Sequence, residues 1–263
     1  GKRIKGKTIL EDISFEINQG DCVALIGPNG AGKTVLMSCI LGDKKPSSGQ
    51  VLIEGKAGKA KNQIAVLLQE NTIPNSLKVT ELIAFFQSIS DNPLTNQEVQ
   101  DLVQFKEDQY QQFADKLSGG QRRLLAFVLC LIDKPKILFL DEPTAGLDPA
   151  GRDELFEEIA GLRKNYAMTI LLVSHSMDDV ARYADEVLVL HQGDLKLEGT
   201  VEEVFSRKEE LEDMGLGLPQ IRALLFDLKK NGLDIQLGNT VEEAVSALSH
   251  YFIEEMRKGV SHA

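Results

Sequence analysis

A glycine-rich segment near the start of the chain carries the residue types that bind a nucleotide phosphate. Its eight residues fit the pattern G-x-x-x-x-G-K-[ST]: Gly27, Pro28, Asn29, Gly30, Ala31, Gly32, Lys33 and Thr34. Glycines let backbone N–H groups close around phosphate at a helix N-terminus, where the helix dipole favours negative charge. We expect Lys33 to reach the β- and γ-phosphates and Thr34 to offer its hydroxyl to Mg²⁺. A glycine turn without a ligand is a poor alternative, because an apolar run, residues 23–26, precedes the segment.

Two adjacent carboxylates, Asp141 and Glu142, follow a second apolar run, residues 137–140. Parallel α/β sheets bind ligands at the carboxyl ends of their strands, where this run would place both side chains. We expect Asp141 to hold Mg²⁺, directly or through water. Glu142, pointing the other way on the strand, would act on an attacking water as a general base worth about 10²–10⁴ in rate. By themselves the two carboxylates would be better explained as a solvated strand end. Because they follow an apolar run in a chain that also has a phosphate-binding pattern, we interpret them as part of the nucleotide site.

Gln69 and His175 each end or follow a further predicted strand, residues 64–68 and 169–173. An isolated histidine in this position is more often a surface or packing residue, and a single glutamine says less. Their place in the order of motifs makes both candidates for the same site.

A second candidate anion site begins at Leu117, where Ser118, Gly119, Gly120 and Gln121 precede a predicted helix. Ser118 can cap that helix, and the N–H groups of the two glycines would then be free to bind an anion. The chain already has one phosphate loop, so a second anion site calls for a second nucleotide. Alone, the segment would also fit a capped glycine turn.

The elements that position these residues alternate between strands and helices, which predicts a parallel sheet in an α/β fold. Residues 13–17 alternate apolar and polar residues as a half-buried strand does. Predicted helices cover residues 32–41, 120–132, 152–164 and 177–183.

Two regions are predicted to lie outside this alternation. Residues from about 70 to 130 form an inserted helical subdomain, because polar sequence there carries apolar residues at helical spacing. We place the catalytic domain at residues 1–208 and a small helical module at 209–263, with amphipathic helices over 219–231 and 240–257. The module either covers the domain's own surface or contacts another subunit.

Composition restricts the partners. The chain has 263 residues, a net charge of −11 and a pI of about 4.9, which argues against duplex nucleic acid as a partner. Its three cysteines lie in apolar runs, as expected for reduced thiols in a cytosolic protein without a signal peptide. The longest apolar run, residues 124–132, is about half of a bilayer span, so other chains would have to supply any membrane path.

Taken in order, the five motifs resemble those of the ATPase subunit of ABC transporters, over roughly residues 8–206. The resemblance implies an α/β P-loop NTPase of ABC type, with a mixed N-terminal β-subdomain, a RecA-like parallel core, an inserted helical subdomain and a helical C-terminal module. It implies ATP and Mg²⁺ as ligands. His175 would contact the γ-phosphate and position the water, and Gln69 would touch Mg²⁺ or that water.

The resemblance also implies an assembly. Residues 118–121, the signature, would close on the nucleotide held by a second ABC ATPase subunit, and the loop that ends at Asp148 would cross the interface. That subunit is either a second copy or a related chain. Transmembrane transporter subunits would complete the assembly at the cytoplasmic face of the membrane, without nucleic acid.

Two features depart from the family pattern. The family begins with an extra strand and an aromatic residue that stacks on adenine, whereas this chain starts Gly1-Lys2-Arg3 and has no aromatic residue before Phe15. We therefore expect weak discrimination between ATP and GTP. Residues 143–263 resemble ATPases of energy-coupling factor (ECF) transporters, whereas residues 8–134 look more like exporter ATPases, with 47 residues between Gln69 and Leu117. Two hypotheses fit this difference between the halves: a chain recombined near residues 141–148, and a natural divergent member of the family.

These observations predict ATP hydrolysis that powers transport, in ECF-type uptake of a vitamin or metal ion. An exporter ATPase remains an alternative. ABC ATPases of DNA repair, chromosome organisation or translation carry coiled-coil or zinc insertions or two cassettes, and none is visible here. A non-catalytic cassette is disfavoured by the presence of Lys33, Glu142 and His175.

Overall fold

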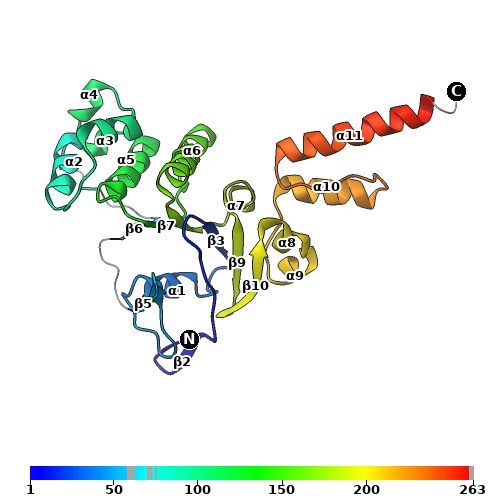
Figure 1. Ribbon diagram of the computed structural model, residues 1–263, viewed down its shortest axis with the longest axis horizontal. Helices are drawn as coiled ribbons and strands as arrows, with labels where there is room; N and C mark the ends of the chain where they lie inside the picture. Colours follow the sequence, from blue (N-terminus) through cyan, green and yellow to red (C-terminus); the bar gives the residue numbers. More distant parts are fainter. Residues whose placement is uncertain (58–62, 70–72, 75, 261–263) are drawn as a thin grey trace.

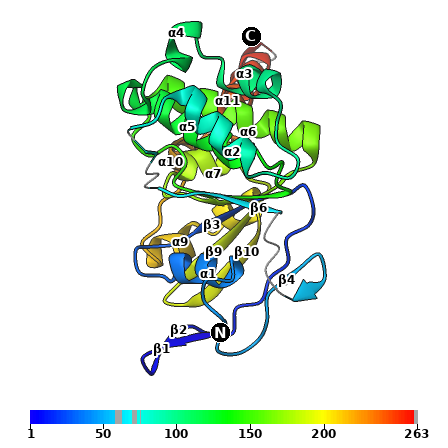
Figure 2. The ribbon, with the colours of Figure 1, turned by 90° about the vertical axis from the view of Figure 1, so that its left-hand side faces the viewer.

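The computed structural model describes residues 1–57, 63–69, 73–74 and 76–260, with side chains described as far as Ile253. Within these ranges the fold is built around one six-stranded sheet with helices on both faces (Figures 1 and 2).

The strand order of this sheet is β10-β9-β3-β8-β7-β6. The strands are β3 (Cys22–Ile26), β6 (Ile64–Leu67), β7 (Ile137–Asp141), β8 (Thr169–Val173), β9 (Glu186–His191) and β10 (Asp194–Thr200). All neighbours pair in parallel except β9 and β10, which form an antiparallel hairpin. All five residues of β3 are buried, as expected for a central strand covered on both faces. The predicted α/β fold with a mostly parallel sheet is confirmed.

Helices cover the two faces of the sheet. On one face, α1 (Lys33–Ile40) packs through Leu36, Met37 and Cys39 against β3, β7, β8 and β9. On the opposite face lie α5 (Gly119–Leu131), α6 (Pro149–Tyr166) and α7 (Met177–Tyr183) (Figure 2). The helix that follows the phosphate-binding segment and the helix that follows the signature therefore lie on opposite faces.

The N-terminal region differs from the prediction. Residues 13–17 lie outside every strand, although Ile13, Phe15 and Ile17 pack against the cluster of β3 and α1. The packing of these three side chains explains why apolar and polar residues alternate here, although the segment forms no strand in the described structure. Two unpredicted strands, β1 (Lys2–Ile4) and β2 (Lys7–Leu10), form an antiparallel pair. A second short pair joins β4 (Leu52–Ile53) and β5 (Lys56–Ala57).

The inserted segment is helical, as predicted, where the structure describes it. It contains α2 (Val79–Ser88), α3 (Asn96–Val103), α4 (Glu107–Tyr110) and a 3₁₀ turn (Ala114–Lys116) before α5. Val79, Leu82 and Val99 are buried in the same hydrophobic cluster as Leu125 of α5. Residues 70–72 and 75, at the start of the predicted subdomain, lie outside the described residues.

The C-terminal segment contains α8 (Val201–Ser206), α9 (Lys208–Asp213), α10 (Gln220–Lys230) and α11 (Val241–Val260). The two amphipathic helices of the prediction are confirmed as α10 and α11, which extend from one side of the molecule in Figure 1. Leu211 and Leu216 pack with the sheet, whereas Leu225 and Ala244 belong to a separate small cluster. The boundary between residues 208 and 209 stays a prediction.

In the part of the chain that the structure describes, no helix is both long enough and apolar enough to cross a membrane.

Candidate active site

The phosphate-binding segment connects the carboxyl end of β3 to α1, and its shape depends on glycine. A Cβ on Gly27 would lie 2.1 Å from the Leu190 carbonyl oxygen. Gly32 has φ of +109°, and a Cβ there would lie 2.7 Å from Cδ2 of Leu10. Only glycine fits such close backbone approaches and positive φ angles without strain. The loop therefore forms an open backbone cradle at the N-terminus of α1, as a phosphate site requires.

Lys33 lies in this cradle and is 9% exposed. Its Nζ donates to the carbonyl oxygen of Gly27 at 2.6 Å and to that of Pro28 at 3.2 Å. Burial lowers the pKa of the Lys33 ammonium, whereas the carboxylates of Glu142 and Asp141 raise it. The loop thus holds a cation next to two carboxylates. Thr34 follows in the first turn of α1 and is exposed.

Asp141 ends β7, but the chain turns at Glu142 instead of continuing as a strand. Asp141 pairs with Val173 of β8. Glu142 has φ of +47°, and its N–H donates to the Val173 carbonyl oxygen at 2.9 Å. The prediction assumed that Glu142 continues the strand, which it does not, so the backbone turn and not strand alternation sets the direction of its side chain. A non-glycine residue with positive φ is uncommon and is often found where a side chain must be aimed.

Glu142 and His175 face each other across the ends of β7 and β8. The Glu142 Oε1 and His175 Nε2 atoms are 3.5 Å apart, and their side chains are 16% and 51% exposed. Burial raises the pKa of Glu142, while the His175 charge and backbone N–H lower it. Among the described residues, Glu142 Oε1 is buried without a hydrogen-bond partner. The structure thus presents a carboxylate with a free acceptor, beside a histidine, at the carboxyl end of the sheet.

Asp141 and Gln69 lie at the ends of neighbouring strands. Burial raises the pKa of Asp141, and the charges of Lys33, Arg123 and His175 lower it. Gln69 follows β6, the strand paired with β7, and its side chain is exposed. The structure therefore brings the two predicted ligands to the same sheet edge.

A magnesium ion bound by Thr34, Asp141 and Gln69 is chemically reasonable. All three side chains offer oxygen atoms, which Mg²⁺ prefers, and Mg²⁺ is usually held by one or two carboxylates together with substrate phosphates. In the described ranges, no group of three or more His, Cys, Asp and Glu side chains could hold a metal by itself. A site completed by phosphates fits these residues better than an all-protein metal cage.

Arg123, which the sequence analysis did not select, lies directly beneath this site. Its side chain is buried in α5, and its guanidinium donates to carbonyl oxygens of Gln69, Asp141 and Glu142. The sequence held one signal for it, because Arg123 shares a helix face with the apolar residues Phe127 and Cys130. A charged residue on a buried helix face needs partners.

The signature residues are arranged differently. The Ser118 hydroxyl accepts from the Gln121 N–H at 3.2 Å, and the Gln121 side chain accepts from the Ser118 N–H at 3.0 Å. This capping box confirms Ser118 as the cap of α5. A Cβ on Gly119 would meet nothing within 4 Å, and one on Gly120 would lie 3.8 Å from Leu147 Cδ2. Ser118 and Gly119 are exposed, so a side chain could be added at Gly119 without meeting described atoms.

Asp148 caps α6, where its carboxylate accepts from the Gly151 N–H at 2.8 Å. Through Leu147, its loop lies beside Gly120. The structure therefore brings the signature and the loop ending at Asp148 together.

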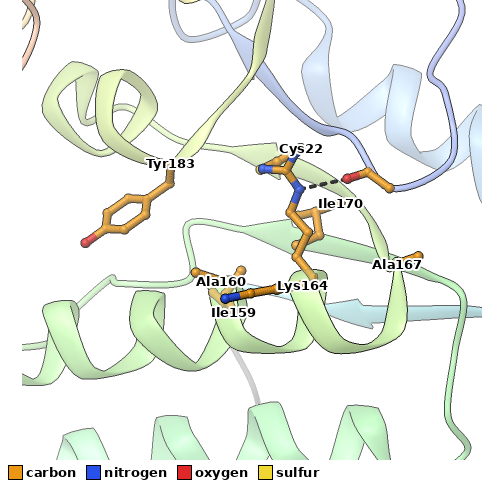
Figure 3. A pocket seen from close by; sticks show the side chains of 9 residues that line it. Cys22, Ile159, Ala160, Lys164, Ala167, Ile170 and Tyr183 are labelled. Atoms are coloured by element: carbon orange, nitrogen blue, oxygen red, sulfur yellow. Dashed lines mark hydrogen bonds between the residues drawn. The ribbon is translucent and has the colours of Figure 1, made fainter.

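A cavity of about 420 Å³ lies at the other end of the sheet (Figure 3). It is lined by Cys22 and Ile170 from β3 and β8, by Lys164 from α6 and by Tyr183 from α7. None of the predicted site residues lines it. Cys22 begins β3 and Ile170 lies near the start of β8, whereas sheets of this type bind ligands at the carboxyl ends of strands. The cavity is therefore separate from the sheet edge that carries Gly27, Asp141 and His175.

Comparison with known proteins agrees with this geometry. The family model described as ABC transporter matches residues 10–145. The energy-coupling factor transporter ATP-binding protein EcfA2 of Clostridium tetani is 37% identical over 269 residues, covering 94% of this chain and 91% of the relative. EcfA2 of Clostridioides difficile is 39% identical over 260 residues, covering 89% and 88%. The solved structure of cbiO1 from Clostridium perfringens, part of the ABC transporter complex cbiONQ, is 30% identical with a TM-score of 0.68, covering 83% of this chain and 92% of that one.

These similarities extend over both halves of the chain. Because one ECF relative aligns with 94% of the residues, the hypothesis of a recombined chain with an exporter-like N-terminal half has no support. The chain belongs to the ABC transporter family of ATP-binding proteins, within the energy-coupling factor type.

Proposed function

We propose that this chain binds and hydrolyses ATP as the nucleotide-binding subunit of an ECF-type transporter at the cytoplasmic face of a cell membrane. Its cargo would be a vitamin or a metal ion taken up through transmembrane partner subunits. The observation that carries the proposal is the carboxylate of Glu142. Among the described residues its Oε1 is buried without a hydrogen-bond partner and lies 3.5 Å from His175 Nε2, and the Glu142 charge raises the pKa of Lys33. An exporter or a non-transport role has no comparable support, because the relatives quoted above are ECF proteins.

In this proposal residues 27–34 hold the triphosphate. Backbone N–H groups of the glycine loop face the phosphates, and Lys33 leaves the carbonyl oxygens of Gly27 and Pro28 to reach the β- and γ-phosphates. Thr34, Asp141 and Gln69 hold Mg²⁺, which neutralises charge on the phosphates when bound.

Glu142 is the general base. Its raised pKa and free acceptor suit a group that takes a proton from the attacking water. His175 orients this carboxylate from one side and contacts the γ-phosphate from the other. Both residues follow parallel neighbouring strands, so the sheet fixes the distance between them.

The signature acts on ATP held by a second ABC ATPase subunit. Ser118, Gly119, Gly120 and Gln121 present a capped helix N-terminus to open space, and the hydrogen bonds given above for Ser118 and Gln121 stay within the capping box. A helix N-terminus in this state suits an incoming phosphate. Asp148, next to Leu147, lies where the two subunits meet.

The C-terminal helices provide a second contact for that subunit. Large apolar side chains remain exposed on them: Leu224, Val241, Val245, Phe252 and Ile253. Arg222 ties the helices to the catalytic domain, since its guanidinium donates to both carboxylate oxygens of Glu202 at 2.5 and 2.7 Å. A chain ending at Leu218, which keeps Leu211 and Leu216 in the core, should fold and bind ATP but associate less with its partner in sedimentation. Unchanged association would remove the module from the interface.

The direct test of the proposed function is Glu142→Gln. This change keeps the size of the side chain and removes the base, so ATP affinity should stay within about threefold while turnover falls by about 10²–10⁴. Binding is measured by equilibrium dialysis with labelled ATP, and turnover by phosphate release.

The matched control is Glu154→Gln on the exposed surface of α6, which should behave as wild type. Turnover that survives in Glu142→Gln would contradict the assignment of the base. A wild-type chain that neither binds nor hydrolyses ATP, with its partner subunits present, would contradict the function as a whole.

A further inference from the structure

Arg123 is a buried arginine whose described hydrogen-bond partners are all backbone carbonyl oxygens. It lies in the second turn of α5, two residues after Gln121, and is 7% exposed. Its five contacts reach two separate segments. They are Nη1 to Leu68 at 2.7 Å and to Gln69 at 3.2 Å, Nη2 to Asp141 at 3.3 Å and to Glu142 at 2.9 Å, and Nε to Pro143 at 2.7 Å.

Both segments belong to the proposed catalytic site. Leu68 and Gln69 follow β6, and residues 141–143 form the end of β7 and the turn after it. This turn carries Glu142 at φ of +47°, a conformation that a non-glycine residue seldom adopts unless its surroundings hold it. Arg123 contacts the carbonyl before, at and after Glu142, so it holds the whole turn.

The chemistry of the guanidinium suits this task. Its N–H donors lie in one rigid plane, and a buried charge is tolerated only when hydrogen bonds satisfy it. Among the described residues Arg123 forms no ion pair with a carboxylate side chain; the loop carbonyls replace one. A lysine would keep the charge but not the planar set of donors.

Packing alone does not explain these contacts. Helix α5 is already held against the sheet by Leu125 and Phe127, which are fully buried. Cys130, two turns after Arg123, also donates from Sγ to the Val66 carbonyl oxygen of β6 at 3.4 Å. What Arg123 adds is a connection to the ends of the strands, where the catalytic groups lie.

We propose that Arg123 is a positioning residue of the ATPase. Its guanidinium fixes the Glu142 turn and the backbone of Gln69 against the first turns of α5. The position of the signature relative to the general base of the same subunit is thereby fixed. This inference rests on the proposed function of Glu142. Because the signature faces the nucleotide of the neighbouring subunit, Arg123 connects the two nucleotide sites through one helix.

The test replaces Arg123 by lysine and, in a second variant, by glutamine. Glutamine is neutral and so avoids a buried unsatisfied charge, which keeps the test usable if the lysine variant does not fold. In either variant the Glu142 turn loses part of its support, and a displacement of about 1 Å can cost about 10² in turnover. We expect kcat to fall by about 10² while the Kd for ATP stays within about threefold, because none of the hydrogen bonds described for Arg123 reaches Lys33 or its loop.

Two control variants separate positioning from general loosening. Arg163→Lys changes a half-buried arginine that also donates to a backbone carbonyl, that of Gly20 at 2.7 Å, at the far end of the sheet. Cys130→Ala loosens α5 against β6 without touching either catalytic segment. Both controls should keep kcat within about twofold of wild type even where their melting temperatures fall as far as that of the lysine variant.

Arg123→Lys or Arg123→Gln with kcat in the range of the controls would overturn the proposal, as would a loss of ATP affinity equal to the loss of kcat. The Glu142→Gln variant distinguishes this failure from failure of the proposed function. If Glu142→Gln abolishes turnover and the Arg123 variants do not, only the positioning role is wrong. If Glu142→Gln retains turnover, the assignment of the base itself has failed.

Discussion

The phosphate-loop region and the signature region are both glycine-rich segments at a helix N-terminus, but their surroundings differ. In the first, Lys33 is buried, hydrogen-bonded to its own loop and close to two carboxylates of the same chain. In the second, Ser118 is exposed, and a Cβ on Gly119 would meet nothing within 4 Å. Two segments of similar sequence therefore have different surroundings. In the part of the chain that the structure describes, charged groups from other elements lie close to the first segment.

The difference shows why two such segments occur in one chain. A helix N-terminus binds an anion through its free N–H groups, but charge neutralisation and a general base must come from other elements. The sheet supplies these to residues 27–34 from β7 and β8. Beside residues 118–121, the neighbour that the structure describes at Gly120 from outside the segment is the apolar side chain of Leu147. The arrangement of the signature thus suits binding to a phosphate group of another molecule.

The largest expected effect on ATP binding is on the phosphate-loop side. Lys33→Ala removes the cation from the cradle and should weaken ATP binding by about 10², since a hydrogen bond to a charged group is worth about 1.5–3 kcal/mol. Equilibrium dialysis with labelled ATP measures this change. Lys44→Ala, an exposed lysine shortly after α1, is the control and should bind ATP as wild type does. Equal affinity in the Lys33 and Lys44 variants would show that residues 27–34 are not the phosphate site.

A smaller effect on ATP binding is expected from His175→Ala, which removes a group beside the base. Turnover should fall by about 10² with ATP affinity within about threefold, as for the loss of one preorganised polar group. The variant also has a pH signature. Burial raises the pKa of Glu142 above its ordinary value of 4.5, so the base is lost as the pH falls through this raised value, and the acid limb of kcat lies above 4.5.

The His175 charge lowers the pKa of Glu142, so its removal should move the acid limb of kcat to higher pH. A pH–rate profile of kcat for both proteins measures the shift. A limb that moves to lower pH would contradict the contact between His175 and Glu142.

Much of this site could be predicted because its signals are local. The pattern of residues 27–34, the carboxylates after residues 137–140 and the cap at Ser118 each depend on a few neighbouring positions. The strand order could not be predicted in the same way, because β3 pairs with β8 and β9 across more than half of the chain. Residues 13–17 show that alternation alone does not identify a strand. Their apolar side chains pack on one side of the chain, which gives the alternating pattern, but the segment pairs with no strand in the described structure.

The orientation of Glu142 and the role of Arg123 were out of reach for a related reason. The turn at Glu142 depends on a positive φ, which the residue types Asp141, Glu142 and Pro143 do not predict. The turn is held by Arg123 of α5, a helix that precedes it in the sequence. Arg123 looks like one more charged residue after the signature until the fold brings two strand ends to it.

The most direct test of whether the phosphate loop and the signature serve different nucleotides compares the ATP affinity of Gly119→Asp and Lys33→Ala, using the dilute isolated chain. Aspartate fits at Gly119, where a Cβ meets open space, and it suits the first turn of a helix, so the fold should be preserved. Its charge would repel a phosphate brought by the partner. We predict that Gly119→Asp, like its neutral control Gly119→Ala, binds ATP within about twofold of wild type, whereas the ATP affinity of Lys33→Ala falls by about 10². Turnover of the assembled Gly119→Asp complex should be lost. A loss of ATP affinity in isolated Gly119→Asp as large as that in Lys33→Ala would place the signature in the chain's own site and contradict its action on the partner's nucleotide.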